Sequence, residues 1–307
     1  MIKIKKNSGI LIDKMELHDL ARLANKKMKK SILYKKGILA GKFSSKIKGR
    51  GMEFAESRLY LPGDEIRHID WKITAKSGKT HTKLFREERE RPVIFVLDQC
   101  RSMFFGSQTR LKSVQAARTA SLLGWRAIKS GDRVGALIFS EKKHQEFRPK
   151  SDQNNYLRML SSIMNEHNHI VSKMNAHEWC FENEFYLSQS LRRLRHLVQP
   201  GSLIYVLSDF SGYNEECKRH FFQLSKHSQV KAILVTDPLE KKINSLSRYA
   251  VSDGQRVSFL DTTNYEVREK YSYSFQKNIE FLENDFRFSN VNFLTVSTTD
   301  ENPLIGE

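Results

Sequence analysis

PVIFVLDQCRSMFFG, residues 92–106, is the stretch that decides the fold of this chain. Its first part, 93–97, is an unbroken apolar run rich in Val, Ile and Phe, which is typical of a strand buried on both faces of a parallel sheet. The apolar run stops at Asp98, and short or polar residues follow. Because ligands bind at the carboxyl edge of open α/β sheets, the sequence predicts a site at Asp98, Cys100 and Ser102.

The rest of the chain alternates strands and helices around this run. Apolar runs at 133–139, 203–207, 230–235, 257–260 and 291–296 predict strands, and 111–129, 217–228 and 266–286 predict helices. Residues 156–197 read as largely helical, with a break at 165–183. This alternation predicts an α/β, doubly wound, mostly parallel sheet with helices on both faces. The strand 203–207 leads to Asp209, so we expect Asp98 and Asp209 to face one crevice.

Composition limits the class of protein. With 307 residues and 39% hydrophobic content, the chain is able to bury a large core. No apolar run reaches the roughly 20 residues of a membrane span, and the first residues lack the apolar core of a signal peptide, so we expect a cytoplasmic protein without a transmembrane segment. Its three cysteines share no CxxC spacing, which argues against a disulfide framework and a zinc cage.

The net charge of +17 is concentrated near the N-terminus. Residues 1–50 hold fifteen Lys/Arg and three Asp/Glu. Such a basic arm is able to bind nucleic acid, anionic lipid or an acidic protein, and it also fits a merely solvated face. The chain carries no RNA-recognition signature or zinc finger to favour nucleic acid.

The segment before the strand 93–97 divides into a helix, a loop and a small β-rich collar. An amphipathic helix is predicted at 11–30, packed on the main domain, followed by an exposed loop at 37–51. Pro62-Gly63 predicts a turn, and the alternation at 69–73 and 81–85 predicts short strands with Trp71 as their core. We therefore expect a basic helix, loop and collar at 1–91, the α/β domain at 92–300 and a tail at 301–307.

The run from residue 49 to residue 106 also resembles a known family. GRGMEFAESRLYLPGDEIRHIDWKITAKSGKTHTKLFREERERPVIFVLDQCRSMFFG is similar to the family called domain of unknown function 58, a von Willebrand factor A-like (Rossmann-like) domain behind a distinctive block. SDFSG and TDP after later strands extend the resemblance over most of the chain. The block supplies further candidate site residues: Arg58, Tyr60, Pro62, Gly63, Asp64, Arg67, Asp70 and Trp71. Charged residues among them are expected to pair across turns, as a structural collar rather than a catalytic site.

The resemblance implies a metal-ion-dependent adhesion site, Asp-x-Ser-x-Ser with a later Thr and Asp, that binds Mg²⁺ or Mn²⁺. Asp98 matches the first Asp, Ser102 the second Ser and Asp209 the later Asp, whereas Cys100 replaces the first Ser. No Thr precedes LSQSLRRL, where Glu182, Asn183 and Glu184 stand. A thiol suits a hard cation poorly, so a weak Mg²⁺ site and a metal-free site both stay open. For Cys100, a reactive thiol and an inert buried thiol also stay open.

Function is implied by the resemblance and by missing motifs. The family is associated with MoxR-type AAA+ ATPases in the assembly or maturation of client proteins. The chain has no GxxxxGK[ST], GxGxxG, GxSxG or HExxH motif. We therefore expect a non-enzymatic interaction module, with a metal-assisted hydrolase using Asp98 and Asp209, or nucleic-acid binding by residues 1–50, as alternatives. His167, His169 and His177 beside Glu166 are interpreted as an exposed polar loop rather than a zinc site.

Overall fold

The computed structural model describes residues 9–31, 52–87, 90–175, 186–243, 248–252 and 257–301. The chain forms two compact units, which we call unit one (residues 1–31 and 91–307) and unit two (residues 32–90). The sequence-based division grouped residues 1–91 together. In the structure, residues 1–31 belong to unit one and residues 32–90 to unit two. The predicted loop at 37–51 and most of the tail at 301–307 lie outside the described residues.

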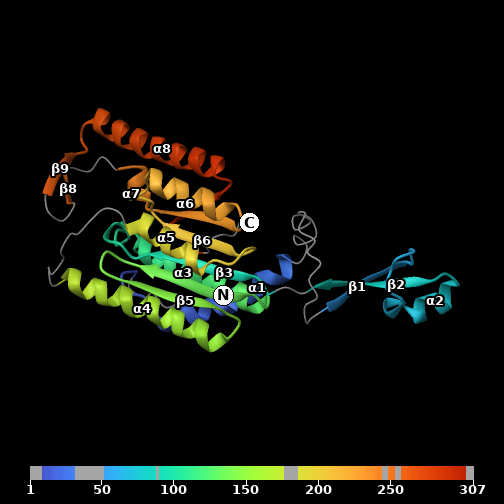
Figure 1. The fold of residues 1–307 in the computed structure, drawn as a ribbon. Coiled ribbons are helices and arrows are strands. Elements are labelled where there is room, and N and C mark those ends of the chain that lie inside the picture. Colours follow the sequence, from blue (N-terminus) through green and yellow to red (C-terminus); the bar gives the residue numbers. More distant parts are fainter. Residues whose placement is uncertain are drawn as a thin grey trace. The chain divides into compact units, whose positions relative to one another are not determined.

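A six-stranded sheet forms the centre of unit one (Figure 1). Five strands are parallel, and the last, at one edge, runs antiparallel to its neighbour. The predicted mostly parallel sheet is thereby confirmed, while the edge strand was missed because its alternating sequence, HQEFRPK, is polar on one face. In spatial order the strands are β10 (Asn292–Ser297), β7 (Gln229–Thr236), β6 (Leu203–Ser208), β3 (Pro92–Asp98), β4 (Arg133–Phe139) and β5 (His144–Lys150).

Helices cover both faces of this sheet, as predicted. Alternate residues of β3 enter two separate cores: Val93, Phe95 and Leu97 lie in one, and Ile94 and Val96 in the other. The first core is closed by α1 (Lys14–Ser31), α3 (Lys112–Lys129) and α4 (Gln153–Asn175). The second is closed by α5 (Tyr186–Leu197), α6 (Glu215–Ser225) and α8 (Tyr265–Phe288). The sheet is therefore doubly wound around β3 (Figure 1).

The N-terminal helix α1 packs on α3, which confirms the predicted docking of this helix. Leu17, Leu20 and Ala24 are buried in the first core. The carbonyl of Leu17 accepts hydrogen bonds from Ser121 Oγ at 2.9 Å and from Trp125 Nε1 at 3.1 Å. The Leu17 carbonyl is buried, where an unmatched carbonyl is costly, so these bonds fix the position of α1.

Helix α4 corrects the predicted break at 165–183, because the helix continues to Asn175. His167 and His169 therefore lie on a helix and not in an exposed loop. The His167 side chain is fully buried, its Nε2–H donates to the Ile10 carbonyl at 2.8 Å, and its ring stacks on Phe104 at 5.0 Å. His177 lies outside the described residues.

Three smaller elements complete unit one. The predicted strand at 257–260 is confirmed as β9 (Val257–Asp261), but it pairs with β8 (Arg248–Ser252) in a separate two-stranded sheet. A single 3₁₀ turn, η2 (Arg101–Met103), follows β3, and the short helix α7 (Pro238–Lys241) follows β7. In the ranges that the structure describes, no helix is both long and apolar enough to cross a membrane.

Unit two is a β-hairpin with a short helix. Strand β1 (Met52–Leu59) pairs antiparallel with β2 (His81–Glu87), which confirms the strand predicted at 81–85. The strand predicted at 69–73 is wrong, because α2 (Trp71–Ser77) begins there, behind the 3₁₀ turn η1 (Ile66–His68). Asp70 explains the helix: its side chain accepts from the backbone N–H groups of Lys72 and Ile73, each at 3.2 Å.

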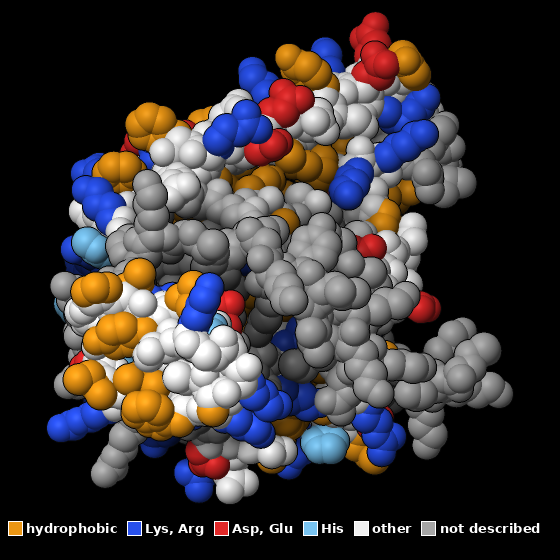
Figure 2. All heavy atoms as spheres, turned by 90° about the vertical axis from the view of Figure 1, so that its right-hand side faces the viewer, with side chains coloured by type: hydrophobic (Ala, Val, Ile, Leu, Met, Phe, Trp, Pro, Cys, Tyr) orange, Lys and Arg blue, Asp and Glu red, His pale blue; other side chains and the backbone are white. Residues whose placement is uncertain are grey.

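The turn predicted at Pro62-Gly63 is present in unit two, but the residue that was expected to form the core of this unit is exposed. Gly63 has φ of +105°, which favours glycine, and Arg58 Nη2 lies 2.7 Å from Asp64 Oδ1 across this turn. Trp71, expected as the core, is 67% exposed because the helix turns its side chain to solvent. Leu59, Leu61 and Ile66 are also exposed. Figure 2 shows hydrophobic and basic side chains side by side on the surface of the molecule.

Candidate functional site

Three neighbouring parallel strands each deliver an aspartate to the carboxyl edge of the sheet. Asp98 ends β3, Asp209 follows β6 and Asp237 follows β7. Leu97 of β3 pairs with Leu207 of β6, so Asp98 and Asp209 reach the same edge. Asp98, Asp209 and Asp237 are buried carboxylates, and each needs partners that offset the loss of water.

Asp98 is bound by the loop that follows it and by β6. Its Oδ1 accepts the Cys100 N–H at 2.8 Å, and its Oδ2 accepts the Ser208 hydroxyl at 2.5 Å. Burial, followed by the negative charge of Asp209, raises the pKa of Asp98 to about 7. This carboxyl is therefore protonated more readily than an exposed aspartate.

Asp209 is paired with a buried lysine. Lys112 Nζ lies 2.8 Å from Asp209 Oδ2 and 2.7 Å from Glu240 Oε1, and the Lys112 side chain is only 3% exposed. Burial acts to raise the pKa of Asp209, but the Lys112 ammonium outweighs it and holds that pKa below its usual value. Burial likewise acts to lower the pKa of Lys112, and the Asp209 and Glu240 carboxylates raise it. The geometry is that of a charged, fully formed ion pair.

The turn after β6 orients this edge through a strained residue. Phe210 has φ of +54°, a left-handed conformation that costs energy for a side chain of this size, and it is buried. Its N–H donates to Ser208 Oγ at 2.9 Å. The Ser211 N–H donates to Asp209 Oδ1 at 3.1 Å, and the Ser211 hydroxyl donates to Ser102 Oγ at 3.1 Å. The strained turn therefore links the loops after β3 and β6.

Asp237 joins the β3 loop to the end of β10. It accepts hydrogen bonds from the Ser107 N–H at 3.0 Å, from the Ser107 hydroxyl, and from the Thr298 hydroxyl at 2.7 Å. Burial acts to raise the pKa of Asp237, but these hydrogen bonds together outweigh it and lower that pKa. Asp237 also begins α7 in a capping box, in which Glu240 Oε2 accepts the Asp237 N–H at 2.8 Å.

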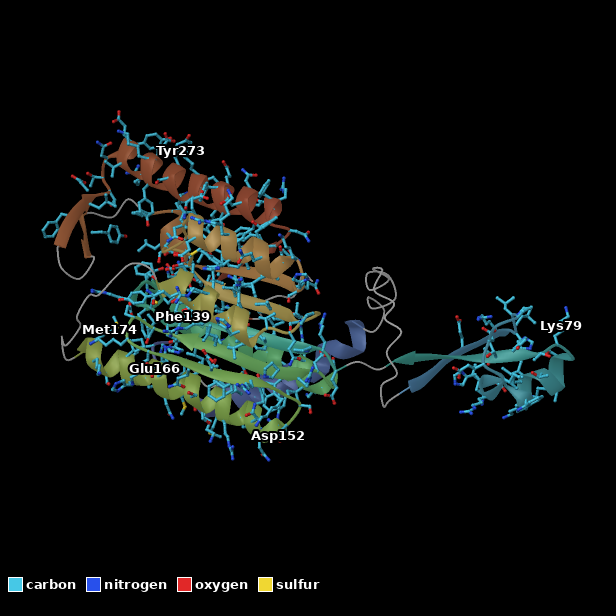
Figure 3. The ribbon with its side chains drawn as sticks, viewed as in Figure 1. Lys79, Phe139, Asp152, Glu166, Met174 and Tyr273 are labelled. Atoms are coloured by element: carbon cyan, nitrogen blue, oxygen red, sulfur yellow. The ribbon has the colours of Figure 1, made fainter. Side chains whose placement is uncertain are left out.

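A cleft of about 440 Å³ opens at this edge. It is mainly polar, and Asp98 and Glu141 are its acidic lining residues. Glu141 Oε1 accepts the Arg101 N–H at 2.5 Å, and burial raises the pKa of Glu141. Phe139, at the end of β4, also lines the cleft and is labelled in Figure 3. Other lining residues are Cys100, Ser102, Ser211, Tyr213 and Asn214.

The Cys100 thiol lines the cleft in its protonated form. Burial, then the negative charges of Asp98 and Glu141, raise the pKa of Cys100 well above its usual value. A thiolate is the nucleophilic form, so this environment favours the inert thiol over the reactive one.

The donor atoms at this edge fit a divalent ion poorly. Both Asp98 oxygens and both Asp209 oxygens already accept hydrogen bonds, one of them from the Lys112 ammonium. Among the other residues that line the cleft, Cys100 offers a soft sulfur, whereas Mg²⁺ prefers hard oxygen ligands such as those of Ser102 and Glu141. Within the described ranges, no group of three or more His, Cys, Asp or Glu is arranged to hold a metal ion. Residues 182–184 lie outside those ranges, and Mg²⁺ or Mn²⁺ at this edge stays a prediction.

The candidate residues of the family block all lie in unit two. Tyr60 donates its hydroxyl to the Asp64 carbonyl at 3.3 Å, and Asp70 accepts the Ser57 hydroxyl at 3.0 Å. With the Arg58–Asp64 pair, these bonds hold the hairpin to its turn and helix. Pro62, Gly63, Arg67 and Trp71 are exposed.

Lys112, Ser208, Glu240 and Glu141 are among the site residues that escaped the sequence analysis. A signal existed for two of them. Asp237-Pro-Leu-Glu240 has the spacing of a capping box. Lys112 places a positive charge in the first turn of a helix, where the helix dipole disfavours it, so it required nearby carboxylates.

Two solved structures align with this chain at low similarity. The conserved hypothetical protein BatB from Bacteroides thetaiotaomicron aligns at 16% identity with a TM-score of 0.43, covering 67% of this chain and 90% of that chain. An aerotolerance-related membrane protein from Bacteroides fragilis aligns at 15% identity with a TM-score of 0.41, covering 67% and 91%.

Sequence comparisons are more specific. The chain is 26% identical over 219 residues to the uncharacterized proteins Rv1480 of Mycobacterium tuberculosis and Mb1516 of Mycobacterium bovis. The match covers 71% of this chain and spans 66% of the length of those relatives. The model of the family described as protein of unknown function DUF58 matches residues 56–280, which include β3, the loops after β3, β6 and β7, and most of unit two's described residues. This chain belongs to the DUF58 family.

Proposed function

We propose that this protein is a non-enzymatic protein-interaction module that binds a MoxR-type AAA+ ATPase and its client protein through the carboxyl edge of the central sheet. In this proposal the edge is a degenerate form of a metal-ion-dependent adhesion site. The protein works in the cytoplasm, where the ATPase finds its nucleotide. The observation that carries the proposal is the polar cleft of about 440 Å³ at the end of β3 and β6.

The partners of the edge residues support a binding role over catalysis. Asp209 is neutralised by Lys112, and Asp237 is bound by Ser107 and Thr298. A general base needs a free lone pair near its substrate, and a nucleophile needs an adjacent base. Asp98, the carboxylate of this group that lines the cleft, accepts hydrogen bonds from the Cys100 N–H and the Ser208 hydroxyl.

The surface of unit two supports a second contact region for a protein partner. Leu59, Leu61, Ile66 and Trp71 are 51%, 57%, 69% and 67% exposed, respectively. Large apolar side chains, and tryptophan above all, supply much of the binding energy where proteins meet. A small hairpin unit that exposes four of them is suited to bind a partner.

The alternative functions have less support. A metal-assisted hydrolase would need Asp98 and Asp209 as ligands, and the Lys112 ammonium competes with a metal ion for Asp209. Nucleic-acid binding was assigned to the basic residues 1–50, most of which lie outside the described residues. Salt-sensitive DNA or RNA binding that is lost on deletion of residues 1–50 would revive that alternative.

The proposal is tested by measuring the affinity of the full chain for a purified MoxR-type ATPase from the same genome. Ser211→Arg fills the cleft with a long cationic side chain and should weaken binding at least tenfold. Gln223→Arg introduces the same residue on the exposed part of α6 and should leave the affinity unchanged. Equal affinities of wild type and Ser211→Arg, or no binding by wild type, would refute docking through this edge.

A further inference from the structure

The carboxyl edge of the sheet contains a buried cation that belongs to the chain itself. Lys112 is the first residue of α3, where the partial positive charge of the helix end opposes an ammonium group. The residue is nevertheless 3% exposed, and its Nζ lies within 2.8 Å of two carboxylates, those of Asp209 and Glu240. The ring of Phe105 lies 5.9 Å from the same nitrogen. A lysine is buried in this way only when paired, so its position depends on these anions.

The ammonium stands at the carboxylate that the family resemblance assigns to a divalent ion. A metal bound to Asp209 Oδ2 at the usual distance of about 2.1 Å would lie within about 5 Å of Lys112 Nζ. Two cations so close inside the protein repel each other strongly. The other Asp209 oxygen accepts the Ser211 N–H, so an ion there would displace the bond that fixes the turn after β6.

Through Glu240 the same ammonium is connected to the remaining loops. Glu240 accepts Lys112 Nζ with Oε1 and the Asp237 N–H with Oε2. Asp237 in turn holds Ser107 and Thr298. The loops after β3, β6, β7 and β10 are thus joined by one network, in which the Lys112 ammonium bridges Asp209 and Glu240.

We propose that Lys112 is the resident cation of this edge and takes the place of the divalent ion, so that the loops are held in their binding arrangement without any metal. This proposal is independent of which partner binds the edge. It predicts that divalent ions neither bind at Asp209 nor order the loop 209–214 in the wild-type protein.

The first test is amide hydrogen exchange of the full chain in the segment 209–214. Wild type should exchange equally in EDTA and in millimolar Mg²⁺. Lys112→Gln, which keeps a hydrogen-bond donor but removes the charge, should accelerate exchange there about tenfold or more, because Asp209 and Glu240 lose their counter-ion. Lys277→Gln, at an exposed position of α8, is the matched control and should change nothing.

The second test does not need a stable variant. Mn²⁺ is titrated into metal-stripped wild type, and the bound fraction is read by electron paramagnetic resonance. No stoichiometric binding below millimolar Mn²⁺ is expected. One-to-one binding that disappears in Asp209→Asn, faster exchange of wild-type 209–214 in EDTA, or unchanged exchange in Lys112→Gln would each overturn the proposal.

Discussion

The ammonium of Lys112 lies 2.8 Å from the carboxylate of Asp209, in the interior of the protein and at the edge of the sheet where ligands of α/β proteins bind. The pair joins α3 to the turn after β6, and Glu240 extends it to α7. An edge held together by an internal salt bridge is pre-organised for binding, since its loops need no ligand to take up their arrangement.

Removal of the Lys112 charge should strongly destabilise the protein. In Lys112→Met, the buried Asp209 and the half-buried Glu240 lose their partner, and breaking a buried ion pair from one side costs about 3–5 kcal/mol. Urea denaturation at pH 7 measures the loss. Lys277→Met, on the solvent side of α8, is the control and should stay within about 0.5 kcal/mol of wild type. A Lys112→Met variant as stable as the control would show that the pair contributes no net stability.

The buried His167 should make stability depend on pH. Burial lowers the pKa of His167 from 6.5 to about 4, so between these values the unfolded chain binds a proton that the folded chain does not. The stabilisation is complete above pH 6.5 and is lost as the pH falls towards 4, by about 3 kcal/mol for this histidine. Denaturation curves of wild type and His167→Gln at pH 7 and pH 4.5 isolate this contribution.

The variant His167→Gln should lose less stability than wild type on acidification. His169→Gln, two residues away at an exposed position of the same helix, should retain the wild-type dependence on pH. Parallel pH profiles for wild type and His167→Gln would contradict the assignment of a neutral, buried imidazole.

The Cys100 thiol should react slowly with alkylating reagents. Its pKa is raised by burial and by Asp98 and Glu141, so almost no thiolate is present at pH 7.5. Labelling with iodoacetamide, followed by mass spectrometry of the Cys100 peptide, compares native protein with protein in urea. Faster labelling of Cys100 in the native protein than in urea would instead identify a reactive thiol.

In unit two, Asp70 and Trp71 should have opposite roles. Asp70→Ala removes the cap of α2 and the acceptor of Ser57, so backbone amides of 71–77 should exchange several-fold faster. Trp71→Ala should leave that exchange unchanged, because its indole contacts mostly water. Trp71→Ala should instead weaken binding to the ATPase. A loss of structure in Trp71→Ala would restore this residue as the core of the unit.

The sequence predicted elements that combine an apolar pattern with a second local signal. β3 is a short run of β-branched and aromatic residues, and α3 is a long helical pattern that ends before Ser130-Gly131. Apolar residues alternate at 69–73, as they do in a strand, but Asp70 caps a helix there. The local capping signal therefore outweighed the alternating apolar pattern. β5 was missed because a half-exposed edge strand contains too few apolar residues to be recognised.

The site was predictable only in part. Asp98 and Asp209 each follow a parallel strand, and the topology brings such residues to one edge. The partner of Asp209 was not predictable, because Lys112 lies 97 residues away in sequence and Glu240 lies 128 residues from Lys112. Only the folded chain shows which carboxylates meet this lysine.

The most direct test of the account is the footprint of the partner on this protein. Hydrogen exchange of the full chain is measured alone and in complex with the purified MoxR-type ATPase, with all conditions matched. The account predicts protection at 99–107 and 209–214, the loops that carry Cys100, Ser102 and Ser211 to the cleft. Protection at 52–87 in addition would mark unit two as a second contact. Protection confined to 52–87, or to segments away from the carboxyl edge, would contradict the central claim.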